Sequence, residues 1–397
     1  MKYKKRQLVA LLSGSVIVTT WGVINICIPA MKQEFPLIPL PFIENVSTIA
    51  SLFIVVGVLL SQKVAKAIGY KPTILLGLAL VTCSGIAPIF LHRFQFVFIS
   101  RALLGLGIGL FQSLLVQMNT FFYDGEQRVK VFGLQSACEG LGGMLSTLLA
   151  GQLILIRWKA VFLVYLLAFF CLLLYGLFVP SVSVHALHAK NVSQDSSQLV
   201  RFTSKETIQV IGLFTITLFL SAMYMMIGIK ITSLIIFLRY GTASDGALFA
   251  ATIGFGAMIA GMVFHRFVRW TKNLLFGICL GLFGTAMFII GVANHLSIAL
   301  SGAFLAGFSF RTLVPYILHY INSGKTKSAG FATSLILIAV NLGAFISPYI
   351  AMFIGVITNI SSPRTVFFYL AIILVCASLI SLLYARYQVL KSSHITA

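Results

Sequence analysis

The sequence predicts an all-α integral membrane protein with twelve transmembrane helices in two six-helix halves. Of the 397 residues, 59% are hydrophobic and 9% are charged, whereas about 25% of a soluble domain is charged. Apolar runs recur that are long enough for a helix of about 20 residues to cross a bilayer. One long polar stretch lies near the middle of the chain. These observations exclude a soluble enzyme, a secreted disulfide scaffold and a disordered chain.

Each predicted helix is an apolar run that ends at charged or turn-forming residues. The helices of the first half cover residues 8–30, 44–68, 72–91, 95–122, 130–155 and 160–180. Those of the second half cover residues 208–238, 245–265, 273–293, 296–320, 328–354 and 364–386. A charge inside such a run is costly, so the charges that do fall inside are candidates for function.

The first apolar run follows a basic start, Met1 to Arg6, and therefore resembles a signal peptide. However, the run continues through Ala30, which is long for the apolar part of a signal peptide, and no small-residue cleavage site follows. We therefore interpret it as the first transmembrane helix.

The polar stretch divides the chain into three parts. We predict a first half over residues 1–180, a cytoplasmic linker over residues 181–206 and a second half over residues 207–397. The halves show a weak internal similarity, because residues 71–77 open the third helix much as residues 271–277 open the ninth. Repeated six-helix halves are typical of transporters that move one half against the other.

The chain carries 28 Lys and Arg against 8 Asp and Glu, a net charge of +20, which in a soluble protein would indicate a nucleic-acid partner. With twelve spans, 19 basic residues fall in the segments of one side, six fall on the other, and three (Arg101, Lys230 and Arg311) lie within spans. Because basic residues concentrate on the cytoplasmic side, we predict a cell inner (plasma) membrane protein with both termini in the cytoplasm. The expected partner of this charge is the lipid bilayer, and no nucleic acid is expected.

Motifs for enzymatic chemistry are missing from the sequence. It has no zinc-protease motif, phosphate-binding loop or nucleophile elbow. The six cysteines lie inside apolar runs without paired short spacing, which indicates neither a metal site nor a disulfide framework. We therefore expect no enzyme activity, no catalytic residues, no cofactor and no metal, and we expect an ion or solute gradient as the source of energy.

The start of the predicted fourth helix carries Arg101 followed by spaced glycines, among them Gly105 and Gly109. This pattern resembles the helix 4 signature of the major facilitator superfamily, and the helix count, the linker and the loops extend the resemblance over nearly the whole chain. The resemblance implies the fold of a twelve-span, bacterial-type transporter of that family. It also implies a gating or packing role for Arg101, Gly105 and Gly109. Glycines at this spacing also let helices approach closely in any membrane bundle, and packing alone is the alternative.

The loop between the second and third helices is similar to that family's best-known loop motif. It keeps the late glycine, Gly69, and a basic residue, Lys71, but Lys66 stands where an Asp is usual. The resemblance implies a gating role for Gly69 and Lys71, while the charge relay that the Asp would support is in question.

The predicted fifth helix is similar to the helix 5 pattern of drug and proton antiporters. Small residues occupy the corresponding positions, but Ser146 and Thr147 stand where the pattern has Gly-Pro. The resemblance therefore favours export only weakly.

Glu139 is the one carboxylate well inside a predicted span, near mid-bilayer on the fifth helix. Loss of water there favours the protonated form, which suits a group that takes up and releases a proton. The alternative is a structural role as the partner of Arg101 or of neighbouring polar groups.

Arg311 lies in the middle of the predicted tenth helix and cannot release its proton, so it needs an anion: Glu139, or a carboxylate or phosphate of a substrate. Lys230 is a second cationic candidate, with snorkelling to the membrane surface as the alternative. The superfamily lines its central cavity mainly with helices 1, 4, 7 and 10. By that resemblance, and from their depth in the spans, further substrate-binding candidates are Asn25, Gln112, Tyr224, Tyr316 and Asn341. Each could instead form a hydrogen bond between helices.

The sequence therefore predicts a secondary active transporter that moves a small organic solute by alternating access, with proton-coupled export as the first hypothesis. Uptake or exchange of an organic anion is the alternative, because three cationic residues lie within spans. A membrane sensor or scaffold without transport is the alternative of another class. The expected partners are a small-molecule substrate, protons and the bilayer, and the expected state is a monomer.

Overall fold

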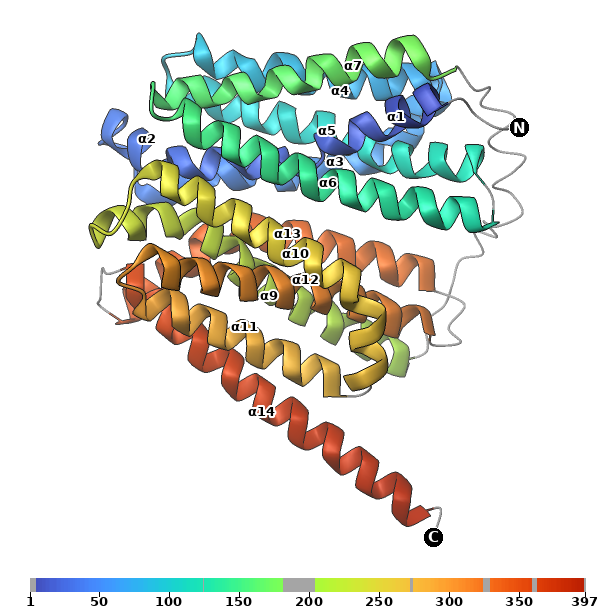
Figure 1. Ribbon diagram of the computed structural model, residues 1–397, viewed down its shortest axis with the longest axis vertical. Helices are drawn as coiled ribbons and strands as arrows, with labels where there is room; N and C mark the ends of the chain where they lie inside the picture. The colour runs from blue at the N-terminus through green and yellow to red at the C-terminus, as the bar shows by residue number, and fades with distance from the viewer. Residues whose placement is uncertain are drawn as a thin grey trace. The chain divides into compact units, whose positions relative to one another are not determined.

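The computed structural model describes residues 5–123, 125–180, 204–271, 274–323, 329–358 and 363–395 (Figure 1). The chain divides into two compact units. One comprises Met1–Ser204 and Ala344–Pro348, and the other comprises Lys205–Gly343 and Tyr349–Ala397. Most of the predicted linker, residues 181–203, lies outside the described residues.

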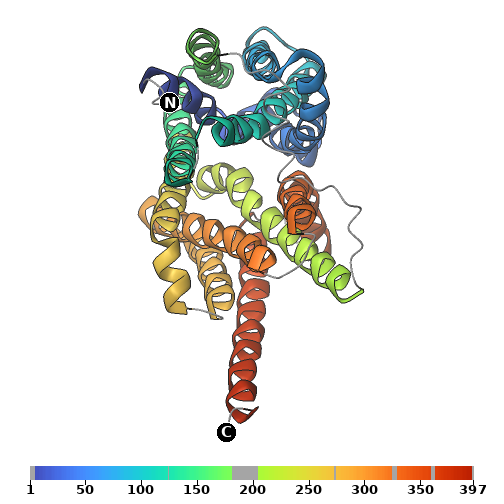
Figure 2. The same ribbon diagram turned by 90° about the vertical axis from the view of Figure 1, so that its right-hand side faces the viewer.

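The first unit contains helices only, within its described residues. They are α1 (Lys5–Ser13), η1 (Gly14–Val16), η2 (Thr20–Cys27), α2 (Ile28–Glu34), α3 (Leu40–Ile68), α4 (Tyr70–Ile86), η3 (Ala87–Ile89), α5 (Phe94–Phe122), α6 (Gly125–Leu153), η4 (Trp158–Tyr165) and α7 (Leu166–Phe178). The elements labelled η are 3-10 helices. In Figure 2 the helices of this unit are seen nearly end-on.

The second unit is likewise helical over its described residues. Its elements are α9 (Ser204–Phe237), α10 (Ala243–Thr271), α11 (Leu275–Val292), α12 (Leu296–Ser323), α13 (Ala329–Thr358) and α14 (Pro363–Ile395). α11 packs between α12 and α14, and α10 packs on α12. The buried core of this unit is apolar and includes Phe249, Phe283 and Phe367.

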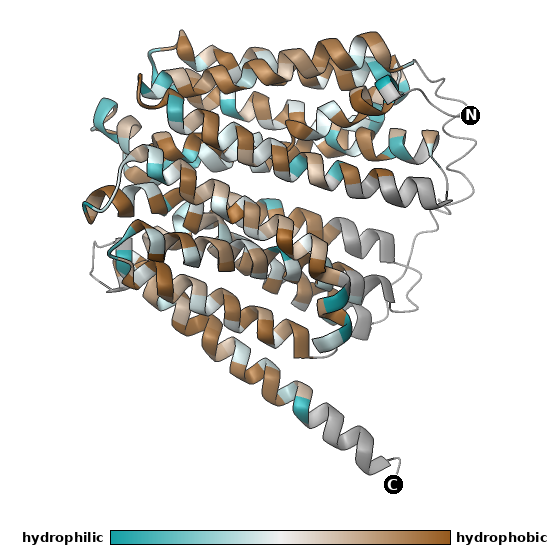
Figure 3. Ribbon diagram, in the orientation of Figure 1, coloured by the Kyte–Doolittle hydropathy of each residue, from teal (hydrophilic) through white to brown (hydrophobic). Residues whose placement is uncertain are grey.

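The predicted all-α membrane fold is confirmed. Eleven segments among the described residues are long and apolar enough to cross a membrane, and Figure 3 shows apolar residues along most of their length. The predicted fifth helix corresponds to α6, which is 29 residues long. Gln135, Glu139 and several glycines interrupt its apolar residues.

The predicted first span over residues 8–30 is confirmed as Arg6–Glu34, but the segment is not a continuous α-helix. The segment is α-helical up to Ser13 and then changes to the 3-10 form in η1 and η2. Ser13 donates a hydrogen bond to the Ala10 carbonyl at 2.7 Å, and Thr20 donates to the Ile17 carbonyl at 2.8 Å. Such bonds from side chain to backbone compete with the regular ladder, and Gly14 lies at the point where the α-helix ends.

Glycines set the spacing of the helices in the first unit. A Cβ at Gly105 would overlap the Ala50 carbonyl, and one at Gly109 would overlap the Ile54 carbonyl, so α5 and α3 are in backbone contact. A Cβ at Gly107 would lie 2.8 Å from the Gly77 carbonyl oxygen on α4. Small residues at such contacts let membrane helices pack without intervening side chains.

Candidate functional site

A chain of polar side chains joins α5 to α6. Glu139 is the middle residue of α6 and is half-buried. Its Oε1 accepts a hydrogen bond of 3.2 Å from Nε2 of Gln135, one helical turn earlier. Gln135 in turn accepts a hydrogen bond from the amide nitrogen of Asn119 on α5. Asn119 and Gln135 are buried, so a path of buried polar side chains leads to the carboxylate.

The break in the first span lies directly against Glu139. Thr19 donates a hydrogen bond of 2.8 Å to the backbone carbonyl of Glu139. One turn further along α6, a Cβ at Gly142 would overlap the Val16 carbonyl, so the two backbones touch. Ser146 is buried, and its hydroxyl has no hydrogen-bond partner among the described residues. The non-α-helical segment and the polar face of α6 therefore form one site.

Arg101 on α5 contacts η2, the second 3-10 segment of the first span. The side chain is completely buried, and its guanidinium donates hydrogen bonds to the Tyr165 hydroxyl at 2.8 Å and to the Trp21 carbonyl. The Tyr165 hydroxyl in turn donates a hydrogen bond of 3.0 Å to the Thr20 carbonyl. A permanently charged group thus binds one carbonyl of a 3-10 segment directly and a second one through Tyr165, where the regular helical ladder is missing.

Two predicted substrate-binding residues lie in the same unit. Asn25 belongs to η2 and is half-buried, and its side-chain oxygen accepts no hydrogen bond from the described residues. A buried amide oxygen without a donor is a candidate contact for a solute hydroxyl or amine, because such groups rarely stay unsatisfied. Gln112 is half-buried on α5.

The loop residues predicted for gating have definite structural roles. Gly69 joins α3 to α4 with φ of 96°, a backbone conformation that favours glycine. Lys71 donates a hydrogen bond of 2.7 Å to the Gly176 carbonyl, near the C-terminal end of α7. A cation at a helix C-terminus is stabilised by the helix dipole. Lys66, at the position where an Asp is usual in the resembling motif, is exposed. A role in gating stays a prediction.

In the second unit, Arg311 and Tyr224 form a cationic and aromatic pair. Arg311 is exposed on α12, and its guanidinium lies near the Tyr224 hydroxyl of α9. The Tyr224 ring is stacked on Phe310, with the ring centres 4.0 Å apart and the planes 9° from parallel. Phe283 packs against Phe310 at 6.3 Å between ring centres. The stack fixes the tyrosine, so the arginine has a rigid neighbour.

Three further predicted residues belong to the second unit. Tyr316 on α12 is half-buried, and its ring lies 6.5 Å from that of Phe276. Asn341 donates a hydrogen bond of 3.0 Å to the Leu337 carbonyl of its own helix, α13. Lys230 is half-buried on α9.

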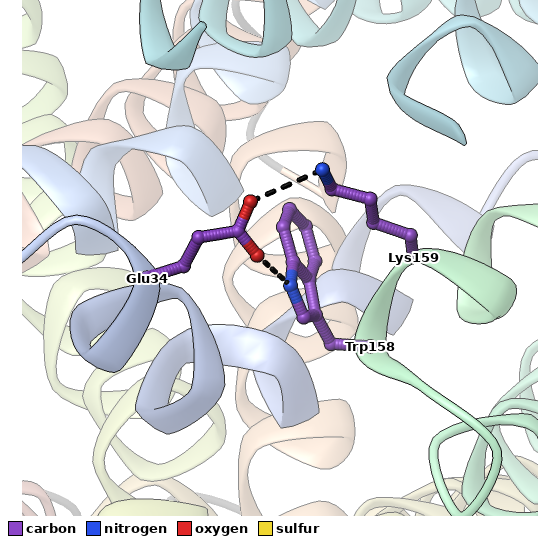
Figure 4. Close-up of polar contacts among 3 residues, drawn as sticks. All are labelled: Glu34, Trp158 and Lys159. Carbon is purple, nitrogen blue, oxygen red and sulfur yellow. Dashed lines mark hydrogen bonds and ion pairs between the residues drawn. The ribbon is translucent and has the colours of Figure 1, made fainter. Parts of the chain in front are cut away.

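The sequence analysis missed an ion pair between α2 and η4 of the first unit (Figure 4). Glu34, the last residue of α2, lies 3.1 Å from the Lys159 ammonium, and its other oxygen accepts a hydrogen bond from the Trp158 indole. The Lys159 ammonium is also 5.4 Å from the centre of the Trp158 ring. These contacts tie the end of the first span to η4. Opposite charges at residues 34 and 159 are visible in the sequence, but their proximity is not.

We expect Glu34→Gln to lower the free energy of unfolding by only about 0.2–1 kcal/mol, because Glu34 is partly exposed and water screens the pair. A double-mutant cycle with Lys159→Met, measured by thermal unfolding in detergent, isolates the pair. A loss several times larger, or no coupling between the two substitutions, would contradict the contact geometry described for Glu34.

Glu44 is a second carboxylate that the sequence analysis did not single out. It stood at the first residue of the predicted second helix, but α3 begins four residues earlier, and Glu44 is completely buried. Thr48 and Asn45 beside it are buried and share a hydrogen bond of 2.8 Å. Pro41 could have indicated that this helix begins before residue 44, since proline favours the first turn of a helix.

Comparison with known proteins now adds to this geometry. The family model described as Major Facilitator Superfamily matches residues 10–348. No curated protein matches the chain.

Solved structures of transporters are similar to the chain over nearly its whole length. A D-xylose–proton symporter is 15% identical with a TM-score of 0.68, over 94% of this chain and 96% of the other. A peptide transporter POT in complex with sulfate is 15% identical with a TM-score of 0.72, over 96% and 94%. The human organic anion transporter MFSD10 (TETRAN) is 14% identical with a TM-score of 0.65, over 96% and 100%. At these identities the similarity shows the fold.

Proposed function

We propose a specific activity for this chain, which belongs to the major facilitator superfamily and is thus a multi-pass membrane protein and a secondary transporter. The activity is export of a small organic solute by alternating access, driven by protons that bind Glu139. The two compact units would be the halves that move. From the distribution of basic residues, both termini would lie in the cytoplasm at the inner (plasma) membrane.

The observation that carries the proposal is the setting of Glu139. It is a carboxylate at the middle of α6, it accepts a hydrogen bond from Gln135, and its backbone is tied to Thr19 at the break in the first span. A half-buried carboxylate that accepts a hydrogen bond from an amide can exist both charged and protonated. The neighbouring part of the first span is not a regular α-helix. Its backbone can therefore shift when the charge on Glu139 changes. The degenerate antiporter-like pattern of α6 favours export.

Purified protein reconstituted in liposomes that contain the pH-sensitive dye pyranine tests the proposal. A panel with a lipophilic cation (tetraphenylphosphonium), an aromatic anion (benzoate) and a neutral solute is added under an imposed pH gradient. Proton-coupled export predicts that one solute drives protons in the direction opposite to its own movement. Proton movement in the same direction indicates uptake, and solute flux without proton movement overturns the coupling. No flux of any solute in the panel supports the sensor or scaffold alternative.

A second candidate function, uptake or exchange of an organic anion, is favoured by the Arg311–Tyr224 pair. An exposed guanidinium beside an anchored phenol can bind a carboxylate through parallel hydrogen bonds. The fold alone does not choose between the functions, since the similar structures include both a proton symporter and an organic anion transporter. The choice depends on the residues.

For this second function, Arg311→Ala should weaken benzoate binding about tenfold or more, because a hydrogen bond to a charged group contributes about 1.5–3 kcal/mol. Arg311→Lys should recover only part of the affinity, since lysine lacks the planar fork. Ligand-induced thermal shift measures both variants. Arg93→Ala, which removes an exposed arginine elsewhere, is the control. Unchanged affinity in both Arg311 variants would assign Arg311 a structural role.

A further inference from the structure

An apolar groove runs between α4 and α7 on the surface of the first unit. The two helices pack side by side (Figure 1). The groove has a volume of about 410 Å³ and is lined by Leu75, Leu76 and Ala79 from α4 and by Leu172, Gly176 and Leu177 from α7, among others.

Gly176 keeps the groove open at one end. A Cβ added at Gly176 would lie 3.6 Å from Leu75 Cδ2, which is ordinary contact, so a longer side chain would extend into the groove. The walls are exposed: Leu177 is 76% and Leu76 is 48% accessible. In a chain that spans the bilayer, exposed leucines on a transmembrane helix face lipid tails, because water does not reach them.

One end of the groove is basic. Lys71 lies one helical turn before Leu75, and its ammonium is 2.7 Å from the Gly176 carbonyl oxygen. That bond uses one of the three N–H donors of lysine and leaves two for another acceptor. Lys63 and Lys66 at the end of α3 are exposed near the same loop, and no acidic residue occurs between residues 63 and 71. The groove thus combines apolar walls with a cation at one end.

We propose that this groove binds one acyl chain of an anionic phospholipid, whose phosphate accepts hydrogen bonds from Lys71. The apolar walls match a hydrocarbon chain, and the cation matches the charge of the headgroup. The site is separate from Glu139 and Arg311, and it assigns the chain a lipid ligand in addition to its transported solute.

Native mass spectrometry of the full chain in mild detergent tests the proposal with added dioleoyl phosphatidylglycerol or dioleoyl phosphatidylcholine. The wild type should retain one phosphatidylglycerol in preference to phosphatidylcholine. Lys71→Gln should reduce that preference about fivefold, since one lysine near an anionic surface contributes about 1 kcal/mol. Gly176→Leu should abolish retention of either lipid at this site by filling the groove. Ala79→Phe fills it from the opposite wall and serves as a second variant if Gly176→Leu does not fold.

Two matched controls make the experiment specific. Gly212→Leu adds the same side chain to α9, where nothing lies within 4 Å of the new Cβ, and should retain the lipid. Lys66→Gln removes the same charge from an exposed position outside the groove and should keep the preference. The proposal is overturned if both groove-filling variants retain phosphatidylglycerol as the wild type does. It is equally overturned if Lys66→Gln matches Lys71→Gln, or if the wild type holds both lipids equally.

Discussion

Replacing Glu139 with glutamine is expected to abolish proton-driven transport while leaving exchange of solute across the membrane intact. Glutamine is nearly isosteric with the protonated carboxyl and can keep a hydrogen bond to Gln135, which lies 3.2 Å from the native oxygen. The Thr19 bond goes to the backbone carbonyl and is not affected. The variant therefore mimics one protonation state permanently, so the conformational cycle can continue but carries no proton. Pyranine-reported proton flux and solute counterflow, measured on the same proteoliposomes, separate these two properties.

Glu34→Gln is the matched control, because it makes the same chemical change in the same unit at a partly exposed position. It should transport at the wild-type rate under the pH gradient. If Glu139→Gln also moves protons at the wild-type rate, the coupling role of Glu139 is wrong. If it loses exchange together with proton flux while thermal unfolding is unchanged, Glu139 contributes to solute binding instead.

Most of the fold could be predicted from the sequence, because membrane spans depend on local composition. A run of apolar residues between charged ends is needed to cross a bilayer whatever it packs against. α5 shows the result: the predicted range of 95–122 differs from Phe94–Phe122 by one residue. The first span shows the limit. Its composition is apolar, but the 3-10 segments η1 and η2 interrupt the α-helix, and hydropathy does not reveal this.

The site was less predictable, since it depends on contacts between helices. Gln135 and Glu139 are four residues apart, and helical periodicity alone places them together. Asn119 joins them only because α5 and α6 pack side by side at that point, and no local pattern indicates this. Arg101 shows the same limit. The sequence identified a cation that needs partners. The partners are a tyrosine hydroxyl and a backbone carbonyl, which are uncharged and therefore cannot be recognised from the pattern of charges.

The aromatic stack of the second unit illustrates a further limit. Tyr224 was a candidate by its depth in the membrane, and Phe310 was one of many phenylalanines without a distinguishing feature. Only the packing of α9 on α12 turns the two into a stack that fixes the tyrosine beside Arg311. A residue type that is common in membrane helices therefore becomes informative only through its neighbour.

Gly105→Leu is expected to prevent folding of the first unit. Even a Cβ at this position would overlap the Ala50 carbonyl, so the obstacle is backbone on both sides and no side-chain rotation relieves it. α5 would have to move away from α3, and the Gly109 contact with the Ile54 carbonyl lies one turn further along the same interface. Overpacking typically costs about 1–3 kcal/mol, and a clash between two backbones should exceed that range. Fluorescence-detected size exclusion and thermal unfolding in detergent measure the loss.

Gly212→Leu is again the matched control, since it introduces the same side chain at a glycine with nothing within 4 Å. It should give a monodisperse protein with a wild-type unfolding temperature, which shows that the effect at Gly105 comes from its neighbour and not from the leucine. Gly105→Ala provides the intermediate step and should already lower the unfolding temperature, because the overlap begins at Cβ. If Gly105→Leu unfolds at the wild-type temperature, α3 and α5 are not in backbone contact at Ala50. If instead it folds but transports slowly, the glycine serves the movement of the helices and not their assembly.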